Sequence, residues 1–343
     1  MCDTQIKIVL LFLIVAGLFL RRCKFQTVDK RFFVAIMVIM ILTVVFRNST
    51  IADYDNYYNS VVFMLGGDRF EPTYHIIRYI SNLTFFPWEF FCLAYASVSV
   101  VLRMKYIRNE SSLIWGSMLV YISNIFITQD MIAIRASAAS AILLYSLKYN
   151  MEDNKKYMLL TISLAAMFHY SALLFLFLLF IDGEKKYRLF YVLLLLGSYI
   201  LAITGLTFGS CLSYLNNDYL TNNYVQNIHV QSLNIFNLVQ MGHVLICLLA
   251  WLFLDVIIKK DNTILLYLKV YTIGLALAVL FSDFLSVALR MSELMLSIDV
   301  IFIPIVFSSL FNNILFKKLS ILSYCMVVLI VNLTSANYWL GNV

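Results

Sequence analysis

The sequence predicts an all-α integral membrane protein, a polytopic helical bundle. Of its 343 residues, 62% are apolar and only 13% are charged, whereas a soluble domain carries roughly 25% charged residues. One water-soluble core cannot bury so much apolar surface, so the surroundings must be lipid. The apolar runs are continuous and the chain has only 3 prolines and 11 glycines. These features favour spanning helices over a membrane β-barrel, whose strands alternate in roughly 10-residue segments.

Eleven apolar runs follow one another along the chain, and each predicts a helix. They cover residues 6–20, 32–46, 87–102, 111–127, 131–147, 157–181, 189–208, 235–258, 263–281, 284–316 and 319–340. We expect about 10–12 transmembrane segments in a single membrane domain, residues 1–343. Basic residues follow the first run instead of preceding it, and no cleavage site is present, so this run is predicted to be a retained helix.

Lysine and arginine gather in short clusters between the runs, which is typical of cytoplasmic loops. The clusters are Arg21-Arg22-Lys24-Lys30-Arg31, Arg103-Lys105-Arg108, Lys148-Lys155-Lys156, Lys185-Lys186-Arg188, Lys259-Lys260 and Lys317-Lys318. The net charge of +6 therefore indicates membrane topology, not nucleic-acid binding. With the N-terminus outside, simple alternation keeps the clusters inside only as far as Lys156. If the run 157–181 enters the membrane and returns to the same side, all of the basic clusters lie on the cytoplasmic side.

The run 157–181 has no Asp, Glu, Lys or Arg, and His169 and Tyr170 lie at its middle. One tilted crossing is possible, because 25 helical residues span roughly 37 Å. A helix broken near His169 would have arms of about 12 residues, too short to span, so it must be buried in protein or line a cavity. The charge rule favours the broken, re-entrant form, and a single crossing is the alternative.

Two polar stretches, about 47–86 and 209–234, are predicted outer loops. The first contains a candidate amphipathic interfacial helix. One side of this helix would carry Tyr74, Ile77 and Ile80, and another side would carry His75 and Arg78. The second stretch is rich in Asn and Tyr, and His229 and His243, in or beside it, are predicted to be loop or interface residues.

Ionisable residues in or beside a membrane are costly, so each is a candidate functional residue. The first outer loop supplies two acids and three tyrosines: Asp53, Glu71, Tyr54, Tyr57 and Tyr58. Carboxylates can act as general bases, and tyrosine rings can hold sugar rings. The alternative interpretation is a solvated loop whose tyrosines belong to the interfacial aromatic belt.

Arg135 lies in a run of small residues that allows close helix contacts, so it is expected to face the bundle. The alternative is a snorkelling arginine paired with Asp130. His169 could be a structural hydrogen-bonding residue or a general base.

Arg290 and Glu293 are three residues apart on one predicted helix, where they could neutralise each other or act on a substrate. Asp299 adds another buried acid. Arginine in a partly desolvated pocket is suited to bind phosphate or pyrophosphate.

The chain contains no Walker A loop, GxGxxG, HExxH or CxxC motif, so nothing indicates a nucleotide cofactor or zinc. The 6 cysteines are interpreted as small apolar residues, not as ligands or disulfide partners. We therefore expect no cofactor and no metal.

Five segments, in this order, resemble the EpsG family of bacterial polysaccharide polymerases of the Wzy type, which include O-antigen polymerases. They are DYDNYY, the following Glu71, IRASAASAILLYSL, KKYMLLTISLAAMFHYSALLFL and LRMSELMLSIDVIFIP. The resemblance covers about residues 50–305. The FHYSAL core around His169 is its most specific part. The last segment departs from the family pattern, with RMSELML where members often carry a tyrosine-containing stretch.

The resemblance implies a glycosyltransferase of the bacterial inner membrane. It would polymerise oligosaccharide repeat units of O-antigen, capsule or exopolysaccharide, carried on undecaprenyl pyrophosphate, at the periplasmic face. Membrane lipid and a chain-length regulator protein are candidate partners, and no nucleic acid is expected. The alternatives are a flippase or transporter of lipid-linked oligosaccharide and a polysaccharide acyltransferase.

The residues found above are suited to the implied reaction. Arg135 and Arg290 would stabilise the departing pyrophosphate. His169 would accept the proton of the incoming sugar hydroxyl, with Asp53 or Glu71 as alternatives. Substrate-binding residues would be Tyr54, Tyr57, Tyr58, Tyr170 and Glu293.

Overall fold

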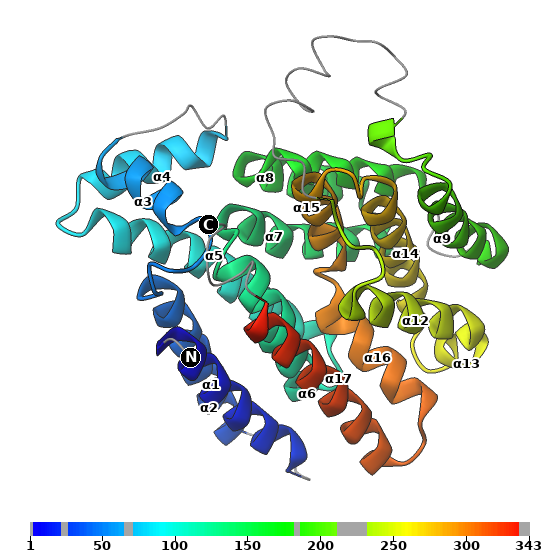
Figure 1. The fold of residues 1–343 in the computed structure, drawn as a ribbon. Helices are drawn as coiled ribbons and strands as arrows, with labels where there is room; N and C mark the ends of the chain where they lie inside the picture. The colour runs from blue at the N-terminus through cyan, green and yellow to red at the C-terminus, as the bar shows by residue number, and fades with distance from the viewer. Residues whose placement is uncertain (1–2, 22–26, 65–70, 182–185, 211–231, 336–343) are drawn as a thin grey trace. The chain divides into compact units, whose positions relative to one another are not determined.

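The computed structural model describes residues 3–21, 27–64, 71–181, 186–210 and 232–335, which are helical and contain no strand (Figure 1). Each of the predicted apolar runs coincides with a helix or with two consecutive helices, so the all-α class is confirmed. The chain divides into two compact units, Met1–Leu179 with Asp299–Val343, and Phe180–Ile298. The assignment of the whole chain to one membrane domain stays a prediction.

The first unit contains most of the candidate functional residues. Its helices are α1 (Asp3–Leu20), α2 (Thr27–Val45), α3 (Tyr54–Val62), α4 (Pro72–Asn82), α5 (Pro87–Glu110), α6 (Ile114–Val120), η1 (Tyr121–Asp130), α7 (Ile134–Met151), α8 (Lys155–Phe168), η2 (Tyr170–Phe180), α16 (Asp299–Leu310) and α17 (Ile314–Thr334). η1 is a π-helix and η2 is a 3₁₀-helix whose last residue opens the second unit. Helix α7 packs on both α5 and α8, because its Ala and Ser side chains let the backbones approach closely.

The second unit comprises five helices among its described residues. They are α9 (Arg188–Ile203), α12 (Leu238–Leu252), α13 (Leu254–Ile258), α14 (Ile264–Leu280) and α15 (Leu285–Leu296). α14 packs on α9, α12 and α15. A Cβ added at Gly274 of α14 would lie 2.8 Å from Cβ of Met295, so glycine is required where α14 meets α15.

The surface of the described residues is suited to lipid. Large apolar side chains are exposed along α1, α2, α9 and α17, and in water such continuous patches would drive aggregation. By length and composition three described helices can cross a membrane (α1, α5 and α17), or four if α15 and α16 form one bent span. Four more apolar helices are shorter. The protein is therefore a polytopic membrane protein, and the predicted number of crossings stays a prediction.

The run 157–181 breaks at His169, as the re-entrant interpretation predicts. α8 begins at Lys155, where the Asn154 side chain accepts a hydrogen bond from the Tyr157 N–H, and it ends at Phe168. His169 then adopts an extended conformation (φ −158°, ψ 118°). The chain then returns along η2 toward the start of α8. Asn150, which precedes α8, donates a hydrogen bond of 3.0 Å to the carbonyl of Leu178 near the end of η2. The two short arms therefore form a hairpin whose tip is His169.

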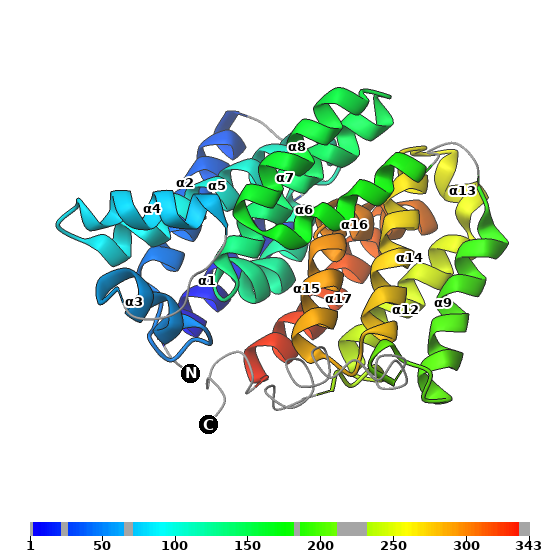
Figure 2. The same cartoon turned by 90° about the horizontal axis from the view of Figure 1, so that it is seen from above.

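The first predicted outer loop folds into two short helices, α3 and α4, which pack on α5 (Figures 1 and 2). The predicted amphipathic helix exists as α4, but its sides differ from the prediction. Tyr74 is fully buried while Ile80 is 42% exposed, because Tyr74 packs on the protein and not at a lipid interface. The second loop lies mostly outside the described residues, and His229 with it.

The prediction for His243 is wrong. This residue belongs to α12, is buried, and hydrogen-bonds the hydroxyl of Tyr271 on α14. The sequence places it beside the polar loop, but the helix begins at Leu238 and carries it into the core of the second unit.

Candidate active site

Three buried ionisable side chains, Glu71, Arg135 and His169, meet in the first unit. Arg135 Nη1 lies 2.5 Å from Oε2 of Glu71, and His169 Nδ1 lies 3.1 Å from Oε1 of the same carboxylate. The exposed fractions are only 7%, 7% and 8% for Glu71, Arg135 and His169. One carboxylate therefore joins a cation and an imidazole that are far apart in the sequence.

Each member of this cluster lies at a helix end, where the local sequence holds it. Glu71 is the N-cap residue of α4 and has extended backbone, and Pro72 supplies the fixed first turn. Arg135 lies in the first turn of α7, and His169 is the hairpin tip. The Thr73 hydroxyl donates a 2.7 Å hydrogen bond to the carbonyl of Met167, so the start of α4 is tied directly to the end of α8.

The electrostatics of the cluster keep Glu71 ionised. Burial raises the pKa of Glu71, but the hydrogen bond from His169 and the positive charge of Arg135 together outweigh it and lower the pKa from 4.5 to about 2. A carboxylate with so low a pKa is a weak base. Glu71 is therefore better suited to orient His169 than to take up a proton itself.

The same carboxylate determines which nitrogen of His169 carries the proton. An ionised carboxylate only accepts hydrogen bonds, so Nδ1–H of His169 donates to Glu71. In the neutral ring Nε2 then carries the lone pair. This atom is buried and has no hydrogen-bond partner in the described part of the chain. The arrangement is that of a general base held in one tautomer by an acid.

Aromatic side chains surround the cluster. Arg135 donates to the Tyr57 hydroxyl from Nε at 3.1 Å, and its guanidinium carbon lies 5.5 Å from the Tyr57 ring centroid and 5.6 Å from that of Tyr74. The Tyr74 hydroxyl is held by Ser60 at 2.5 Å. Tyr95 of α5 contacts Phe168 beside the hairpin tip, a position that sequence reasoning missed. Tyr57 is the tyrosine of the DYDNYY segment that reaches the cluster.

The other predicted site residues of the first unit lie away from the cluster. Asp53 is exposed and is contacted by Asn56 at 3.3 Å. Tyr54 and Tyr58 are half-buried and stack on each other, with centroids 5.6 Å apart. Tyr170 is 47% exposed. Asp53 makes no contact with Arg135 or His169 among the described residues, so the geometry does not favour it as the base.

Arg290 and Glu293 belong to α15 of the second unit. Arg290 is exposed and Glu293 is half-buried. Asp299, the other predicted buried acid, belongs to the first unit, is fully buried, and accepts a 3.1 Å hydrogen bond from Asn124.

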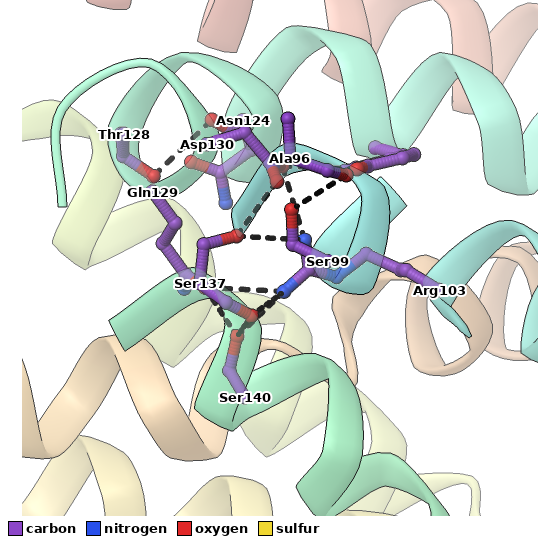
Figure 3. A network of polar contacts seen from close by, with 10 residues as sticks. Ala96, Ser99, Arg103, Asn124, Thr128, Gln129, Asp130, Ser137 and Ser140 are labelled. Carbon is purple, nitrogen blue, oxygen red and sulfur yellow. Dashed lines mark hydrogen bonds and ion pairs between the residues drawn. The ribbon is translucent and has the colours of Figure 1, made fainter. Parts of the chain in front are cut away.

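Sequence reasoning missed a second buried ion pair, between Arg103 and Asp130 (Figure 3). Arg103 Nη1 lies 3.0 Å from Oδ2 of Asp130, and both side chains are 0% exposed. Ser137, Ser140 and Gln129 also accept hydrogen bonds from Arg103. The network joins α5, the π-helix η1 and the start of α7, and it holds the backbone break that precedes Arg135.

This network corrects two predictions. Asp130 pairs with Arg103, not with Arg135, because the π-helix η1 ends at Asp130 and a break separates it from α7. Arg103 does not belong to a solvated loop cluster, because α5 continues as a helix to Glu110 and buries it. The signal in the sequence was weak: Arg103 directly follows an apolar run and is flanked by other basic residues.

Within the described residues no three His, Cys, Asp or Glu side chains are grouped as they would be around a metal ion. The three cysteines described as free, Cys92, Cys247 and Cys325, are buried, which suits their interpretation as small apolar residues.

A family model described as the EpsG family matches residues 30–342, nearly the whole chain. No curated protein matches the sequence significantly. No solved structure matches it either.

Proposed function

The chain belongs to the EpsG family, whose members are Wzy-type polymerase-like membrane proteins, and from this membership we propose that it is a glycosyltransferase. Its proposed reaction joins oligosaccharide repeat units carried on undecaprenyl pyrophosphate into a surface polysaccharide. The observation that carries this proposal is the buried cluster of His169, Glu71 and Arg135, because it supplies the base that glycosyl transfer needs.

In the proposed reaction, a hydroxyl of the incoming lipid-linked unit attacks the anomeric carbon of the growing chain. His169 Nε2 accepts the hydroxyl proton while the new glycosidic C–O bond forms. The bond between the anomeric carbon and the phosphate oxygen breaks, and the electron pair leaves with undecaprenyl pyrophosphate. Glu71 holds the imidazole in position and stabilises the imidazolium that forms.

In this proposal Arg135 has a different role from the pyrophosphate contact expected from the sequence. Its charge is compensated by Glu71 at 2.5 Å, so its first function is to hold the carboxylate that orients His169. The stacked Tyr54 and Tyr58 rings are suited to hold a sugar of the bound chain, and the apolar helix surfaces are suited to the polyprenyl tails. Arg290 and Glu293 remain candidate substrate-binding residues of the second unit.

The proposal places the protein in the bacterial inner membrane with the cluster facing the periplasm, where lipid-linked units are joined. A chain-length regulator protein is its proposed partner. The basic clusters between the apolar runs support a cytoplasmic location for those loops.

The test is a deletion of the gene, followed by gel analysis of the surface polysaccharide. A polymerase predicts a single repeat unit on its lipid anchor in place of a ladder. Complete absence of the unit would instead identify a flippase. An intact ladder without an acyl substituent would identify an acyltransferase, and an intact, unmodified ladder would overturn all three functions.

Complementation with variants then tests the site. His169→Ala should leave single units only, and Arg135→Ala should do the same, because either change removes the oriented base. His75→Ala is the matched control, since His75 is an exposed histidine on α4, and it should restore the full ladder. Membrane insertion and the melting temperature of each variant are measured in parallel. A wild-type ladder from His169→Ala would refute the assignment of the base.

A further inference from the structure

Arg47 is a buried arginine that no part of the proposed reaction uses. It follows the end of α2 and is only 5% exposed. Its Nη1 donates a 2.9 Å hydrogen bond to the carbonyl of Met131. The guanidinium carbon lies 5.1 Å from the Trp88 ring centroid and 5.9 Å from that of Tyr54. The group therefore lies beside both aromatic rings and is held by one hydrogen bond.

The other edge of this guanidinium has no partner. Nε and Nη2 of Arg47 are both buried and make no hydrogen bond to the described residues. These two nitrogens are the parallel donors along one side of the planar group, which is the edge that binds two oxygens of a phosphate or carboxylate. Glu89, the half-buried acid next to Trp88, makes no ion pair with Arg47. An unpaired buried charge is strongly unfavourable, so this edge is suited to bind an anion.

The other two buried arginines of this unit differ from Arg47 in this respect. Arg103 has Asp130 at 3.0 Å, and Arg135 has Glu71 at 2.5 Å. Both charges are compensated within the protein. Among the described, deeply buried arginines, Arg47 is the one whose charge no carboxylate compensates.

Arg47 and the His169 cluster contact the same group of aromatic rings. The ring centroid of Trp88, which lies beside Arg47, is 6.4 Å from that of Phe91. The ring centroid of Phe91 is 6.2 Å from that of Tyr57, whose hydroxyl accepts a hydrogen bond from Arg135. The backbone gives a second connection, since Met131 lies four residues before Arg135.

We propose that the Nε–Nη2 edge of Arg47 binds a phosphoryl oxyanion of the polyprenyl pyrophosphate substrate. The inference rests on the proposed function and moves the phosphate contact from Arg135, whose charge Glu71 compensates, to Arg47. The donors are shielded, so the oxyanion reaches them when the side chain of Tyr54 or Trp88 turns aside. Such side-chain changes are common on binding.

The experiment measures binding directly, with the full-length protein in nanodiscs of phosphatidylcholine. The probes are undecaprenyl pyrophosphate, inorganic pyrophosphate and phosphatidylglycerol. Arg47→Gln removes the charge, Arg47→Lys keeps the charge but not the two parallel donors, and Arg108→Gln is the control at an exposed arginine of α5. Both Arg47 variants should bind undecaprenyl pyrophosphate at least about tenfold more weakly, because two charge-assisted hydrogen bonds are lost. Arg108→Gln should bind as the wild type does.

Stability separates this function from a structural one. Removal of a structural arginine lowers the melting temperature, whereas removal of an unpaired buried charge leaves it unchanged or raises it. Arg47→Met should therefore melt at or above the wild-type temperature without substrate. Lower stability with unchanged binding would overturn the proposal. Equally tight binding of phosphatidylglycerol would overturn it as well, since the site would then belong to bulk phospholipid.

The two proposals can fail independently. If Arg47 variants bind the pyrophosphate lipid as tightly as the wild type while the wild type still polymerises, the Arg47 site is refuted and the proposed function survives. If binding depends on Arg47 but the gene deletion leaves the ladder intact, the site survives and the polymerase function is refuted. His169→Ala should keep the binding and lose the ladder, which separates phosphate binding from base catalysis.

Discussion

Replacement of Glu71 by glutamine is the most direct perturbation of the candidate active site. Glu71→Gln keeps the size and a hydrogen-bonding oxygen but removes the negative charge. Arg135, only 7% exposed, is then left without a carboxylate, and His169 loses a charged acceptor. Both effects destabilise the fold before any substrate binds.

The loss of the Glu71 charge should lower the free energy of unfolding by about 3 kcal/mol. Removing one partner of a buried ion pair lowers the free energy of unfolding by roughly 3–5 kcal/mol. The pKa of Glu71 moves from 4.5 to about 2 on folding, and at 1.36 kcal/mol per pKa unit this corresponds to roughly 3 kcal/mol. A loss of about 3 kcal/mol corresponds to a decrease of roughly 6–12 °C in melting temperature, by the scaling for domains of 150–250 residues.

The assay is thermal unfolding of the purified protein in detergent, followed by intrinsic fluorescence, from pH 7 downward. The folded-state pKa of Glu71 is lowered, so the stabilisation is complete above pH 4.5 and is lost as the pH falls through about 2. The difference between the wild type and Glu71→Gln should follow this course. Glu110→Gln is the control, because Glu110 pairs with Lys148 at 2.8 Å but the two side chains are 24% and 33% exposed. Its expected loss is below about 1 kcal/mol.

Equal losses for Glu71→Gln and Glu110→Gln at pH 7 would refute the buried ion pair. A difference between wild type and Glu71→Gln that persists unchanged to the lowest pH would refute the charge argument, because protonated glutamate and glutamine are then equivalent. Either result would remove the physical basis for the orientation of His169.

Further outcomes follow from the Arg103 network and from the hairpin. Asp130→Asn should lower the free energy of unfolding by roughly 3–5 kcal/mol. The double change Arg103→Met with Asp130→Leu should restore part of the lost stability, because no buried charge is left unpaired. Equal melting temperatures for the wild type, the single variant and the double variant would contradict this. Cysteines at positions 156 and 186, introduced as Lys156→Cys and Lys186→Cys, should react with an impermeant maleimide from the same side of the membrane, because the chain returns after His169. Labelling from opposite sides would identify a single crossing.

The helical membrane fold could be predicted from the sequence because hydropathy acts locally. Each run of apolar residues forms a helix wherever it lies in the bundle, since lipid leaves its backbone no other hydrogen-bond partners. The break at His169 was also indicated, because the Lys155-Lys156 and Lys185-Lys186 pairs at the two ends of one run favour the same side of the membrane. The helices α3 and α4 were harder to predict from the sequence, because they are short and polar and are stabilised by packing on α5.

The sequence by itself marked Arg135, His169 and Asp299 as candidates, because an ionisable group in an apolar run is costly unless it has a role. It did not mark the buried Arg47 and Arg103. Their partners were decided by the tertiary structure. Glu71 was predicted as an alternative base, yet it orients His169, because Arg135 and His169 both approach its carboxylate and lower its pKa. Arg135 was predicted to bind the pyrophosphate, and Arg47 was not predicted to be a site residue. Compensation of a buried charge depends on which atoms lie within hydrogen-bond distance, and only packing brings residues so distant in the chain into contact.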